Sequence, residues 1–501
     1  MKRLIILLFA VVSAAAMWAD NYNDNAEIDV NGVLVDERKL DITITEHNGL
    51  YDVCLNDLAV SKGSSTTVIG NVNLKDIKPV SSFGNIVLLA NQDVEINQGT
   101  QPVKMAAKIE NGELIAKFSI DMTTSLSQVI DIRFGSNMLN GKYYHVPNGN
   151  FEKWHVASEG YIEPNAWHSF ESASGSMASM AGHHITRSNN GRNNSKCVRI
   201  ITTEEEINLG FMIKMVTANG TLTTGRMNCG SWAASDPSNN TFLDMSKTDK
   251  DGNGDPFYVE LTHRPDSLVT WLQFNRVDTD PEHPWCVVSA TVTDGTYYQE
   301  PEPTDAQYSN ILCKALNHDI VATGGKWKRI SIPFDYSSYP YGVSPKAILI
   351  NASSNAYKGA GKAGDEVLLD DLTLIYNNRL RQLAVTGFSS NKFDYEVSND
   401  IDIDLLKAIA DGKESHVLKT EKPANDGKYI FVDVYSADLK SCNTYTIHCK
   451  TGTGIAVTNK ATDAATETYY NLGGQRIAAP QHGKISIVKT SDGRTVKVAN
   501  K

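Results

Sequence analysis

Apolar and polar residues alternate along much of the amino-terminal part of the chain. Residues 40–45 alternate strictly, and the dipeptide Asn48-Gly49 follows them. Alternation with a period of two predicts a strand with one buried face, and Asn-Gly is a preferred turn of two-residue hairpins. The same arrangement surrounds Asn111-Gly112. Consecutive hairpins of this kind predict an up-and-down sheet or a small barrel over residues 20–140.

Short segments rich in Val, Ile and Thr, separated by Gly, Asn, Asp and Ser, continue to the carboxyl terminus. This pattern is typical of all-β domains. Residues 402–410 form the best helix candidate, although their first apolar positions also fit a strand. The expected domains are a barrel (20–140), a jelly-roll β-sandwich (141–378), a small immunoglobulin-like sandwich (379–450) and a linker with a carboxy-terminal hairpin tail (451–501).

Residues 1–19 have the composition of a signal peptide. Two basic residues precede an apolar run that ends at Val12, and small residues follow up to Ala19. This order of charged, apolar and small residues is typical of a cleaved leader. The run is too short to cross a bilayer, and no later segment has the roughly 20 apolar residues of a membrane span. We therefore expect an exported protein without a transmembrane segment.

The charge and the cysteines exclude other classes of protein. The net charge of −11 argues against a nucleic-acid partner, because phosphates require basic surfaces. The seven cysteines lack the spacing of a zinc site. Cys442 and Cys449 lie in one continuous strand-like segment, where their separation exceeds the reach of a disulfide. We expect these two cysteines not to be bonded to each other.

All tryptophans that follow the leader lie in the jelly-roll region: Trp154, Trp167, Trp232, Trp271, Trp285 and Trp327. Flat indole rings stack on sugar rings, and exposed aromatic surface is costly without a ligand. Trp232 and Trp285 lie in loop-like sequence, so we expect them to bind ligand. Trp154, Trp167 and Trp327 belong to strand-like motifs and are expected to be buried. The alternative is that all of these rings fill the sandwich core.

The amino-terminal region resembles a known family. Its strand at residues 70–74 and its closing strand at residues 130–134 are similar to those of the calycin-like β-barrel domain of exported proteins in Gram-negative bacteria. This resemblance implies a barrel, and it implies a protein of the periplasm, the cell surface or the medium. Small barrels are often filled by their own side chains, so we expect a structural barrel.

Two further regions carry resemblances. The opening residues 148–154, the segment 327–333 and the closing residues 367–374 resemble the carbohydrate metabolism domain, a jelly-roll module. This resemblance implies a glycan-related protein, but fold-level analogy does not name the sugar. The strands at residues 470–477 and 483–488 resemble the carboxy-terminal sorting domains of type IX secretion, although the usual Tyr is absent. A small structural hairpin is the alternative for this tail.

Two cation sites are candidates in the jelly-roll region. Glu152 near the first strand can meet Asp370 or Asp371 on the last strand, which would give the oxygen ligands that a structural Ca²⁺ takes. The alternative is that these carboxylates accept hydrogen bonds from turn amides or pair with Arg or Lys.

The second candidate is a loop with the spacing of a calcium-binding motif: Asp249, Asp251, Asn253, Asp255 and Glu260. Pro256 and the strand-like residues after it argue against an EF-hand, which requires a helix at that point. Residues of these types also form ordinary hairpin loops.

Motifs of catalysis are scarce. The sequence has no nucleophile elbow, no zinc-protease motif and no phosphate-binding loop. His183-His184 point to opposite faces of any strand and have no identified partner, and the acidic run Glu204–Glu206 is typical of a solvated turn. A glycosidase, however, needs only two facing carboxylates and leaves no local motif.

The sequence therefore favours an exported, non-catalytic glycan-binding protein that serves polysaccharide utilisation. Its expected partner is a polysaccharide or an oligosaccharide. One alternative is a glycoside hydrolase with a carboxylate pair in the jelly roll. The other is a structural or adhesive surface protein whose partners are other cell-surface proteins.

Overall fold

The computed structural model describes residues 18–62, 65–158, 160–208, 210–250, 252–277, 282–339, 341–450, 468–480, 482–489 and 495–499. The protein is all-β, as predicted. The α-helices of the described part are two short segments, α1 (Thr123–Leu126) and α2 (Ser136–Asn140). Neither of these described helices has the length and apolar character of a membrane span. The leader at residues 1–17 lies outside the described residues, and the strands begin at Trp18.

The chain divides into two compact units. Unit 1 comprises Met1–Arg381, Ala410–Leu418 and Val434–Asn443. Unit 2 comprises Gln382–Ile409, Lys419–Asp433 and Thr444–Lys501.

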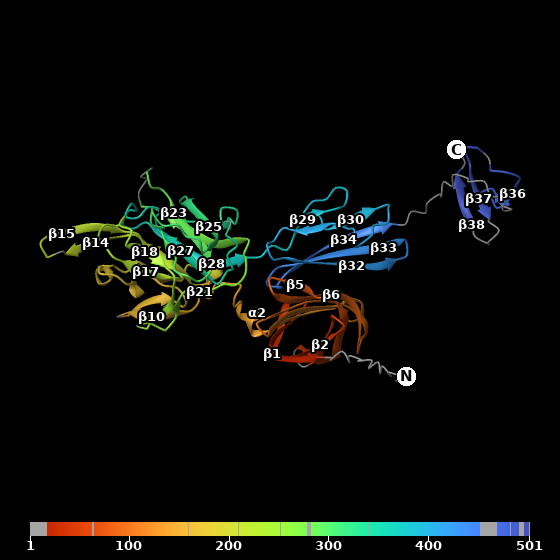
Figure 1. Cartoon of the computed structure of the whole chain (residues 1–501), viewed down its shortest axis with the longest axis horizontal. Helices are drawn as coiled ribbons and strands as arrows, with labels where there is room; N and C mark the ends of the chain where they lie inside the picture. Colours follow the sequence, from red (N-terminus) through yellow and green to blue (C-terminus); the bar gives the residue numbers. More distant parts are fainter. Residues whose placement is uncertain are drawn as a thin grey trace, which may run out of the picture. The chain divides into compact units, whose positions relative to one another are not determined.

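The first part of unit 1 is a curled antiparallel sheet of nine strands (Figure 1). The strands are β1 (Trp18–Val30), β2 (Val33–His47), β3 (Leu50–Lys62), β4 (Ser65–Ile77), β5 (Val80–Ser82), β6 (Asn85–Ile96), β7 (Gly99–Glu110), β8 (Glu113–Met122) and β9 (Gln128–Phe134). Their order is β4-β3-β2-β1-β9-β8-β7-β6-β5, so β1, the first strand in the sequence, pairs with β9, the last. The N–H of Asn97 donates to the carbonyl of Ile69 at 3.1 Å, which draws the region after β6 towards β4.

The turns and the interior of this sheet follow from the alternating sequence. Asn48 and Gly49 have φ of 52° and 76°, the left-handed values that an Asn-Gly hairpin turn requires. The alternate apolar residues point inward, and Ile42, Leu55 and Phe118 are each 0% exposed. The predicted hairpin at Asn48-Gly49 is therefore confirmed.

The second part of unit 1 is a sandwich of two sheets. The first sheet has the order β12 (Ile185–Ser188), β13 (Cys197–Ile201), β28 (Glu366–Ile375), β22 (Ser267–Asn275) and β26 (Lys328–Pro333). The second has the order β16 (Thr221–Thr223), β27 (Ala347–Ser353), β23 (Cys286–Thr293) and β25 (Ile311–Ile320), and β21 (Val259–Glu260) also pairs with β27. Apolar side chains of both sheets, such as Leu272 and Ile350, belong to one core.

Smaller elements surround the sandwich and form the walls of its sites. The hairpins are β10 (Trp154–Ser158) with β11 (Tyr161–Pro164), β14 (Thr203–Asn208) with β15 (Ile213–Ala218), and β19 (Asp244–Thr248) with β20 (Pro256–Phe257). A further sheet contains β17 (Arg226–Cys229), β18 (Asn239–Phe242) and β24 (Gln299–Glu300). Single turns of 3₁₀ helix lie at η1 (Phe170–Ser172), η2 (Ala178–Met180) and η3 (Arg192–Asn194).

The remaining strands form three small sheets. One pairs β29 (Leu380–Leu383) with β31 (Ala408–Ala410). The second has the order β30 (Asp394–Val397), β34 (Cys442–Lys450), β33 (Gly427–Tyr435) and β32 (His416–Ala424), with β30 parallel to β34. The third has the order β36 (Arg476–Ile477), β35 (Thr468–Tyr470), β37 (Ile485–Lys489) and β38 (Thr495–Ala499).

Two local predictions can be compared with these strands. Residues 402–410 were expected to form a helix, but residues 403–405 form a turn and β31 follows. The Nζ of Lys419 donates to the carbonyls of Ile403 and Leu406, and thereby satisfies backbone groups of this turn without a helix. No disulfide joins any of the seven cysteines, so the expectation that Cys442 and Cys449 are not bonded to each other is confirmed.

Candidate functional site

A cavity of about 390 Å³ lies in unit 1, on the face of the second sheet that points away from the sandwich core. Its walls come from the hairpin β14–β15, the sheet β17–β18–β24 and the strands β23, β25 and β27. The cavity contains one of the two predicted ligand-binding tryptophans, Trp232. Polar residues that were not singled out in the sequence also line it, among them Asn240, Glu300 and Asn351.

The Trp232 loop is fixed by one side chain, Asn239 of β18. The Oδ1 atom of Asn239 accepts hydrogen bonds from the N–H groups of Gly230 and Ser231 at 3.0 and 3.1 Å. Its Nδ2 donates to the carbonyls of Ser231 and Ala233 at 2.9 and 2.8 Å. These bonds on both sides of Trp232 hold the backbone of the loop, so the ring is presented from a rigid support.

The Trp232 ring is 39% exposed. The Nζ of Lys214, on β15, lies 3.6 Å from the ring centroid. A cation over an indole face is attracted by the electron density of the ring. The hairpin β14–β15 therefore contacts the Trp232 loop through this pair, and its residues Glu205, Ile207 and Val216 continue the wall of the cavity.

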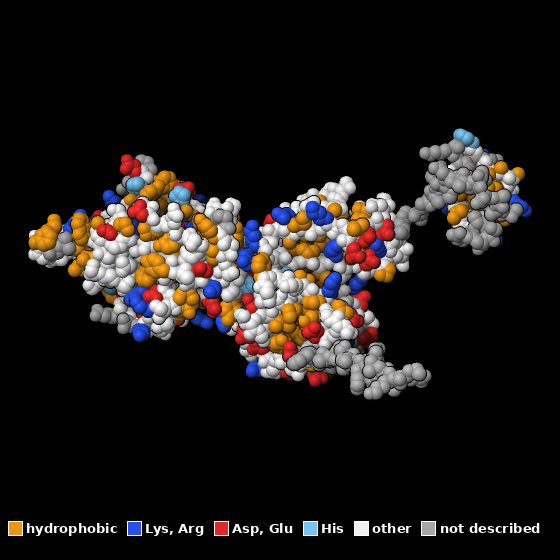
Figure 2. Space-filling model, in the orientation of Figure 1, with side chains coloured by type: hydrophobic (Ala, Val, Ile, Leu, Met, Phe, Trp, Pro, Cys, Tyr) orange, Lys and Arg blue, Asp and Glu red, His pale blue; other side chains and the backbone are white. Residues whose placement is uncertain are grey.

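The free end of the same hairpin is apolar. Phe211, Met212, Ile213 and Met215 are between 49% and 84% exposed. Figure 2 shows hydrophobic side chains gathered at this end of the molecule, where Figure 1 places β14 and β15. An apolar surface thus continues outward from the cavity.

Glu300 of β24 supplies a carboxylate to the cavity. It accepts a hydrogen bond from the hydroxyl of Ser289 at 2.7 Å and one from Nδ2 of Asn351 at 3.2 Å. Burial raises the pKa of this carboxyl, although these two hydrogen bonds oppose the rise. Glu205, the middle residue of the acidic run, is a second carboxylate in the lining.

Two amide oxygens of the lining lack hydrogen-bond donors. The Oδ1 atoms of Asn240 and Asn351 are buried and have no partner among the described residues. Their Nδ2 groups donate to the carbonyl of Pro237 and to Glu300. A buried acceptor without a partner costs about 1–3 kcal/mol.

The other predicted tryptophans differ in their surroundings. Trp285 is half-buried and does not line the cavity, but its carbonyl accepts a hydrogen bond at 2.8 Å from Ala356, which does. Trp167 is 0% exposed, as predicted. Trp154 and Trp327 are only half-buried, which corrects the prediction that both are buried. Each occupies an end of its strand-like motif, where fewer neighbours cover the ring.

Glu152, Asp370 and Asp371 each contact residues 192–196, but their carboxylate oxygens do not all lie within 4.8 Å of one another. Asp370 is 0% exposed, and its Oδ2 accepts hydrogen bonds from the N–H of Arg192 and the hydroxyl of Ser195. Asp371 pairs with the guanidinium of Arg192, and Glu152 accepts the N–H of Lys196 at 2.7 Å. These contacts to backbone amides and to Arg192 are the ones expected if the carboxylates bind no ion. A calcium site at these residues stays a prediction.

The described residues of the predicted calcium loop differ in their surroundings. Asp249 is 5% exposed, whereas Glu260 is exposed. Asp255 accepts hydrogen bonds from the N–H of Ala166 and from Asn253. Asp251 lies outside the described residues. Calcium coordination by this set also stays a prediction.

The histidine pair is divided between surface and interior. His183 is exposed, pairs with Glu171 and stacks on Tyr161 with ring centroids 3.2 Å apart. His184 is buried, and its ring hydrogen-bonds the carbonyl of Ile201. The two side chains thus point in opposite directions, as predicted.

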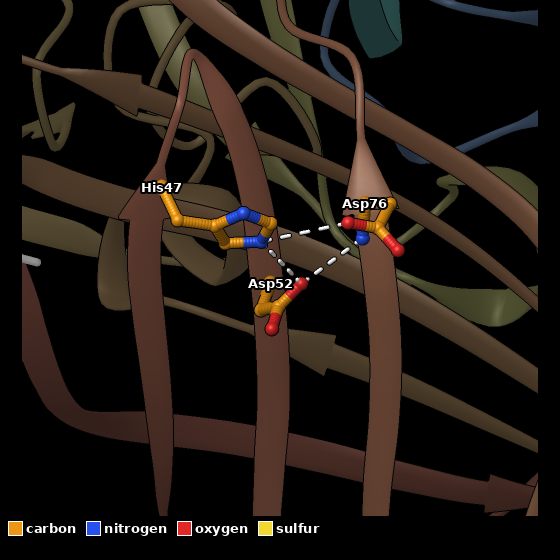
Figure 3. Close-up of side chains that lie close together, drawn as sticks. All are labelled: His47, Asp52 and Asp76. Atoms are coloured by element: carbon orange, nitrogen blue, oxygen red, sulfur yellow. Dashed lines mark hydrogen bonds and ion pairs between the residues drawn. The ribbon is translucent and has the colours of Figure 1, made fainter. Parts of the chain in front are cut away.

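A separate cluster of titratable groups lies on the curled sheet (Figure 3). The Nε2 of His47 lies 3.0 Å from Asp52, whose other oxygen accepts a hydrogen bond from Lys75 at 2.8 Å. Burial raises the pKa of Asp52, but hydrogen bonds from Lys75, His47 and the N–H of Asp76 outweigh it and lower the pKa to about 2. Because a lysine already compensates Asp52, this cluster is a surface salt-bridge network.

Comparisons with known families, sequences and structures do not identify the function of this chain. No family model matches the chain, and no curated protein sequence matches it. A solved structure, the fructofuranosidase from Schwanniomyces occidentalis complexed with fructose, aligns at 9% identity over 66% of this chain and 68% of that chain, with a TM-score of 0.13. A TM-score this low carries no argument about function. The function of the protein must therefore be inferred from its own fold and cavity.

The cavity residues that sequence reasoning missed share one property. Asn240, Glu300 and Asn351 come from three different strands and are separated by at least 51 residues of sequence. Each is a common polar residue in a strand-like segment. Only the pairing of the strands brings them to one cavity.

Proposed function

We propose that this protein is an exported, non-catalytic glycan-binding protein and that the cavity beside Trp232 holds the sugar. The observation that carries this proposal is the exposed indole ring at a cavity that is also lined by the polar side chains of Asn240, Asn351 and Glu300. Sugars present apolar ring faces and hydroxyl groups together, so an aromatic ring beside polar side chains matches them.

The size and charge of the cavity support a small segment of a glycan. Its volume of about 390 Å³ lies within the usual range of small-ligand sites. Lys214, over the Trp232 ring, and Lys358 contribute positive charge, while Glu205 and Glu300 contribute negative charge. Such a balance favours a neutral or weakly charged glycan. The apolar end of β14–β15 offers surface for a longer chain outside the cavity.

Binding of soluble glycans by the full mature chain tests the proposal. We expect isothermal titration against a panel of neutral polysaccharides to detect at least one ligand, with no release of reducing ends on prolonged incubation. Trp232→Ala should weaken binding at least tenfold, whereas Trp327→Ala, at a half-buried ring outside the cavity lining, should retain it. Absence of any bound glycan for the wild type, or full binding by Trp232→Ala, would contradict the proposal.

A second function is favoured by one observation. Glu205 and Glu300 both line the cavity, and the raised pKa of Glu300 is a property of the general acids of glycosidases. A hydrolase would release reducing ends from the bound glycan, and Glu300→Gln would stop this release without loss of binding. Reducing-end assays on the wild type and this variant separate the two functions.

The proposal that the protein is exported rests on residues 1–19, which have the composition of a signal peptide. Amino-terminal sequencing of the protein from the cell envelope or the medium tests it. The expected first residue is Met17 or Asp20, after cleavage at Ala16 or Ala19. An intact Met1 on exported protein would contradict this part of the proposal.

A further inference from the structure

Three ionisable side chains converge below the hairpin β10–β11, in unit 1. His155 of β10 and Glu163 of β11 are directly paired across the hairpin. Asp249 follows β19 and enters the same place. One ligand atom of each residue lies within 4.8 Å of those of the other two. The side chains of His155, Glu163 and Asp249 are 9%, 0% and 6% exposed.

Each of these three residues has one atom held by the protein and one atom free. The Oε1 of Glu163 accepts hydrogen bonds from the N–H and the hydroxyl of Ser169. The Oδ1 of Asp249 accepts the N–H of Gly252 at 3.3 Å. By contrast, Nε2 of His155, Oε2 of Glu163 and Oδ2 of Asp249 are buried without a hydrogen-bond partner among the described residues.

The hydrogen bond of His155 determines which of its nitrogens carries a lone pair. Its Nδ1 lies 3.3 Å from Oδ1 of Asn165, an atom that can only accept, so Nδ1 carries the proton. The lone pair of the neutral ring is then on Nε2, which faces Oδ2 of Asp249 at 3.9 Å. Three acceptor atoms thus face one another, and a cation between them would satisfy all three.

The separation of these atoms fits one small ion. Nitrogen and oxygen ligands lie about 2.0–2.2 Å from Zn²⁺, which places two ligand atoms roughly 3–4 Å apart. The distance of 3.9 Å between Nε2 of His155 and Oδ2 of Asp249 is too long for a hydrogen bond and falls within that range. A bound ion explains this spacing better than a direct contact.

The charge balance of the cluster also calls for a cation. Two carboxylates are buried here, and within 4 Å the ion-pair partners of Glu163 and Asp249 among the described residues are histidines, His168 and His155. The His47 cluster of Figure 3 differs, because Lys75 compensates its central carboxylate. A divalent ion would balance the charge of these two buried carboxylates.

His168 places a further nitrogen beside the cluster. Its Nε2 donates to the carbonyl of Pro256 at 3.0 Å, which leaves the lone pair on Nδ1, where the hydroxyl of Ser172 lies at 3.4 Å. This Nδ1 lies 3.9 Å from Oε2 of Glu163. The donor set is therefore mixed imidazole and carboxylate, which suits Zn²⁺ and related transition metals, whereas Ca²⁺ takes oxygen ligands alone.

We propose that Nε2 of His155, Oε2 of Glu163 and Oδ2 of Asp249 bind one divalent transition-metal ion, with Zn²⁺ as the probe. The ion joins the hairpin β10–β11 to the loop that follows β19, and it serves a structural role apart from the glycan cavity. Asp249 thus acts in a cation site, but with partners and a metal class that differ from those of the calcium-loop pattern.

Gly252 offers a way to block the site without removing a ligand. A Cβ at this position would lie 2.1 Å from Oδ2 of Asp249 and 3.2 Å from Nε2 of His155. Its backbone is outside the positive-φ region, so an alanine there is not strained by conformation. Gly252→Ala should therefore place a methyl group against the ligand atoms while the three ligands remain in the chain.

The test is metal binding by the full chain after removal of metals with a chelator. We expect one Zn²⁺ per chain by elemental analysis after equilibrium dialysis, and a higher melting temperature with Zn²⁺ than without it, because a ligand of the folded state stabilises it by mass action. Co²⁺ in place of Zn²⁺ should give visible absorption bands. His155→Ala, Glu163→Gln and Gly252→Ala should each lose the bound equivalent, and His47→Ala should keep it.

Three results would overturn the proposal. The first is a wild-type chain that binds no Zn²⁺ or Co²⁺, as expected if a proton on His155 or a water molecule occupies the site. The second is retention of a full equivalent by both His155→Ala and Gly252→Ala. The third is displacement of Zn²⁺ by an equal concentration of Ca²⁺. Circular dichroism of each metal-free variant identifies folding failure, and Gly252→Ala then decides, because it retains every ligand.

Discussion

The Nζ of Lys214 lies 3.6 Å from the centroid of the Trp232 ring. Because the ring retains 39% exposure, the lysine leaves indole surface open to solvent. The contact holds a large apolar ring at a fixed orientation beside a cavity. A ring that is already ordered loses little conformational entropy when a ligand stacks on it.

The tryptophans provide the first prediction, a contrast between binding and stability. Trp232→Ala should weaken glycan binding at least tenfold and change the melting temperature little, because the ring is exposed. Trp167→Ala should cost about 3–5 kcal/mol of unfolding free energy, since this ring is fully buried. Titration calorimetry and urea unfolding of both variants measure the two effects. A large stability loss in Trp232→Ala would mean that this ring belongs to the core.

Trp285 leads to a different expectation. Its ring lies 6.2 Å from that of Tyr357, and its backbone, not its ring, supports the cavity residue Ala356. Trp285→Ala should therefore reduce stability by about 1–3 kcal/mol, typical of a partly buried ring. Glycan affinity should fall less than in Trp232→Ala. If both variants lose binding equally at unchanged stability, Trp285 contacts the ligand directly, as its loop sequence suggested.

Substitution of Arg192 and addition of Ca²⁺ distinguish two interpretations of Glu152, Asp370 and Asp371: ion pairing and hydrogen bonding within the protein, or a calcium site. Its guanidinium pairs with Asp371 and lies 3.8 Å from the Trp271 ring centroid. Arg192→Met should lower the unfolding free energy by about 0.5–1 kcal/mol, and a melting temperature of the wild type that does not change on addition of Ca²⁺ would show that these carboxylates are satisfied without the ion. A calcium-dependent rise that Glu152→Ala abolishes would instead establish the structural calcium site of Glu152, Asp370 and Asp371.

His416 predicts a loss of stability in acid. Burial lowers the pKa of His416 to about 3, with a further contribution from Lys108. The unfolded chain takes up this proton near pH 6.5, whereas the folded chain resists it, so stability is full above about pH 6.5 and falls below it. The expected slope is roughly 1 kcal/mol per pH unit between pH 6 and 4.

Urea unfolding of the wild type and His416→Gln at several pH values measures this slope. The difference between the two proteins should shrink as the pH falls, because the variant lacks the proton-binding group. Glu163 contributes with the opposite sign in the metal-free chain, since its pKa is raised, but it is present in both proteins and cancels. A pH-independent difference would show that His416 does not carry the effect.

The sequence was sufficient where structure is local. The turn at Asn48-Gly49 was predictable because Asn and Gly tolerate the positive φ that the turn requires. The helix predicted at residues 402–410 is absent because a short apolar pattern fits a helix and a strand equally well. Residues Ala408–Ala410 pair with the distant strand β29, and local sequence does not reveal that partner.

The sites depend on pairing between distant strands. Trp232 could be predicted because its ring and loop context are local features. Asn351 and Glu300 meet only because β24 and β27 both reach the cavity, so no spacing rule could have joined them. The proximity of His155 and Glu163 could have been predicted from the sequence, since they flank a turn near Gly160 and form a cross-strand pair of one hairpin. Asp249 completes that cluster from a remote loop.

The pairing of β1 with β9 has a consequence for the order of folding. Residues 26–30 of β1 pair with residues 130–134 of β9. Strand β1 therefore lacks one of its two neighbouring strands until β9, the last strand of the sheet, has been synthesised. The hairpins between them can form early, because they are local, but closure depends on contacts of long sequence separation, which form slowly. A chain that stops short of β9 would leave β1 with an open edge and a strong tendency to associate with other chains.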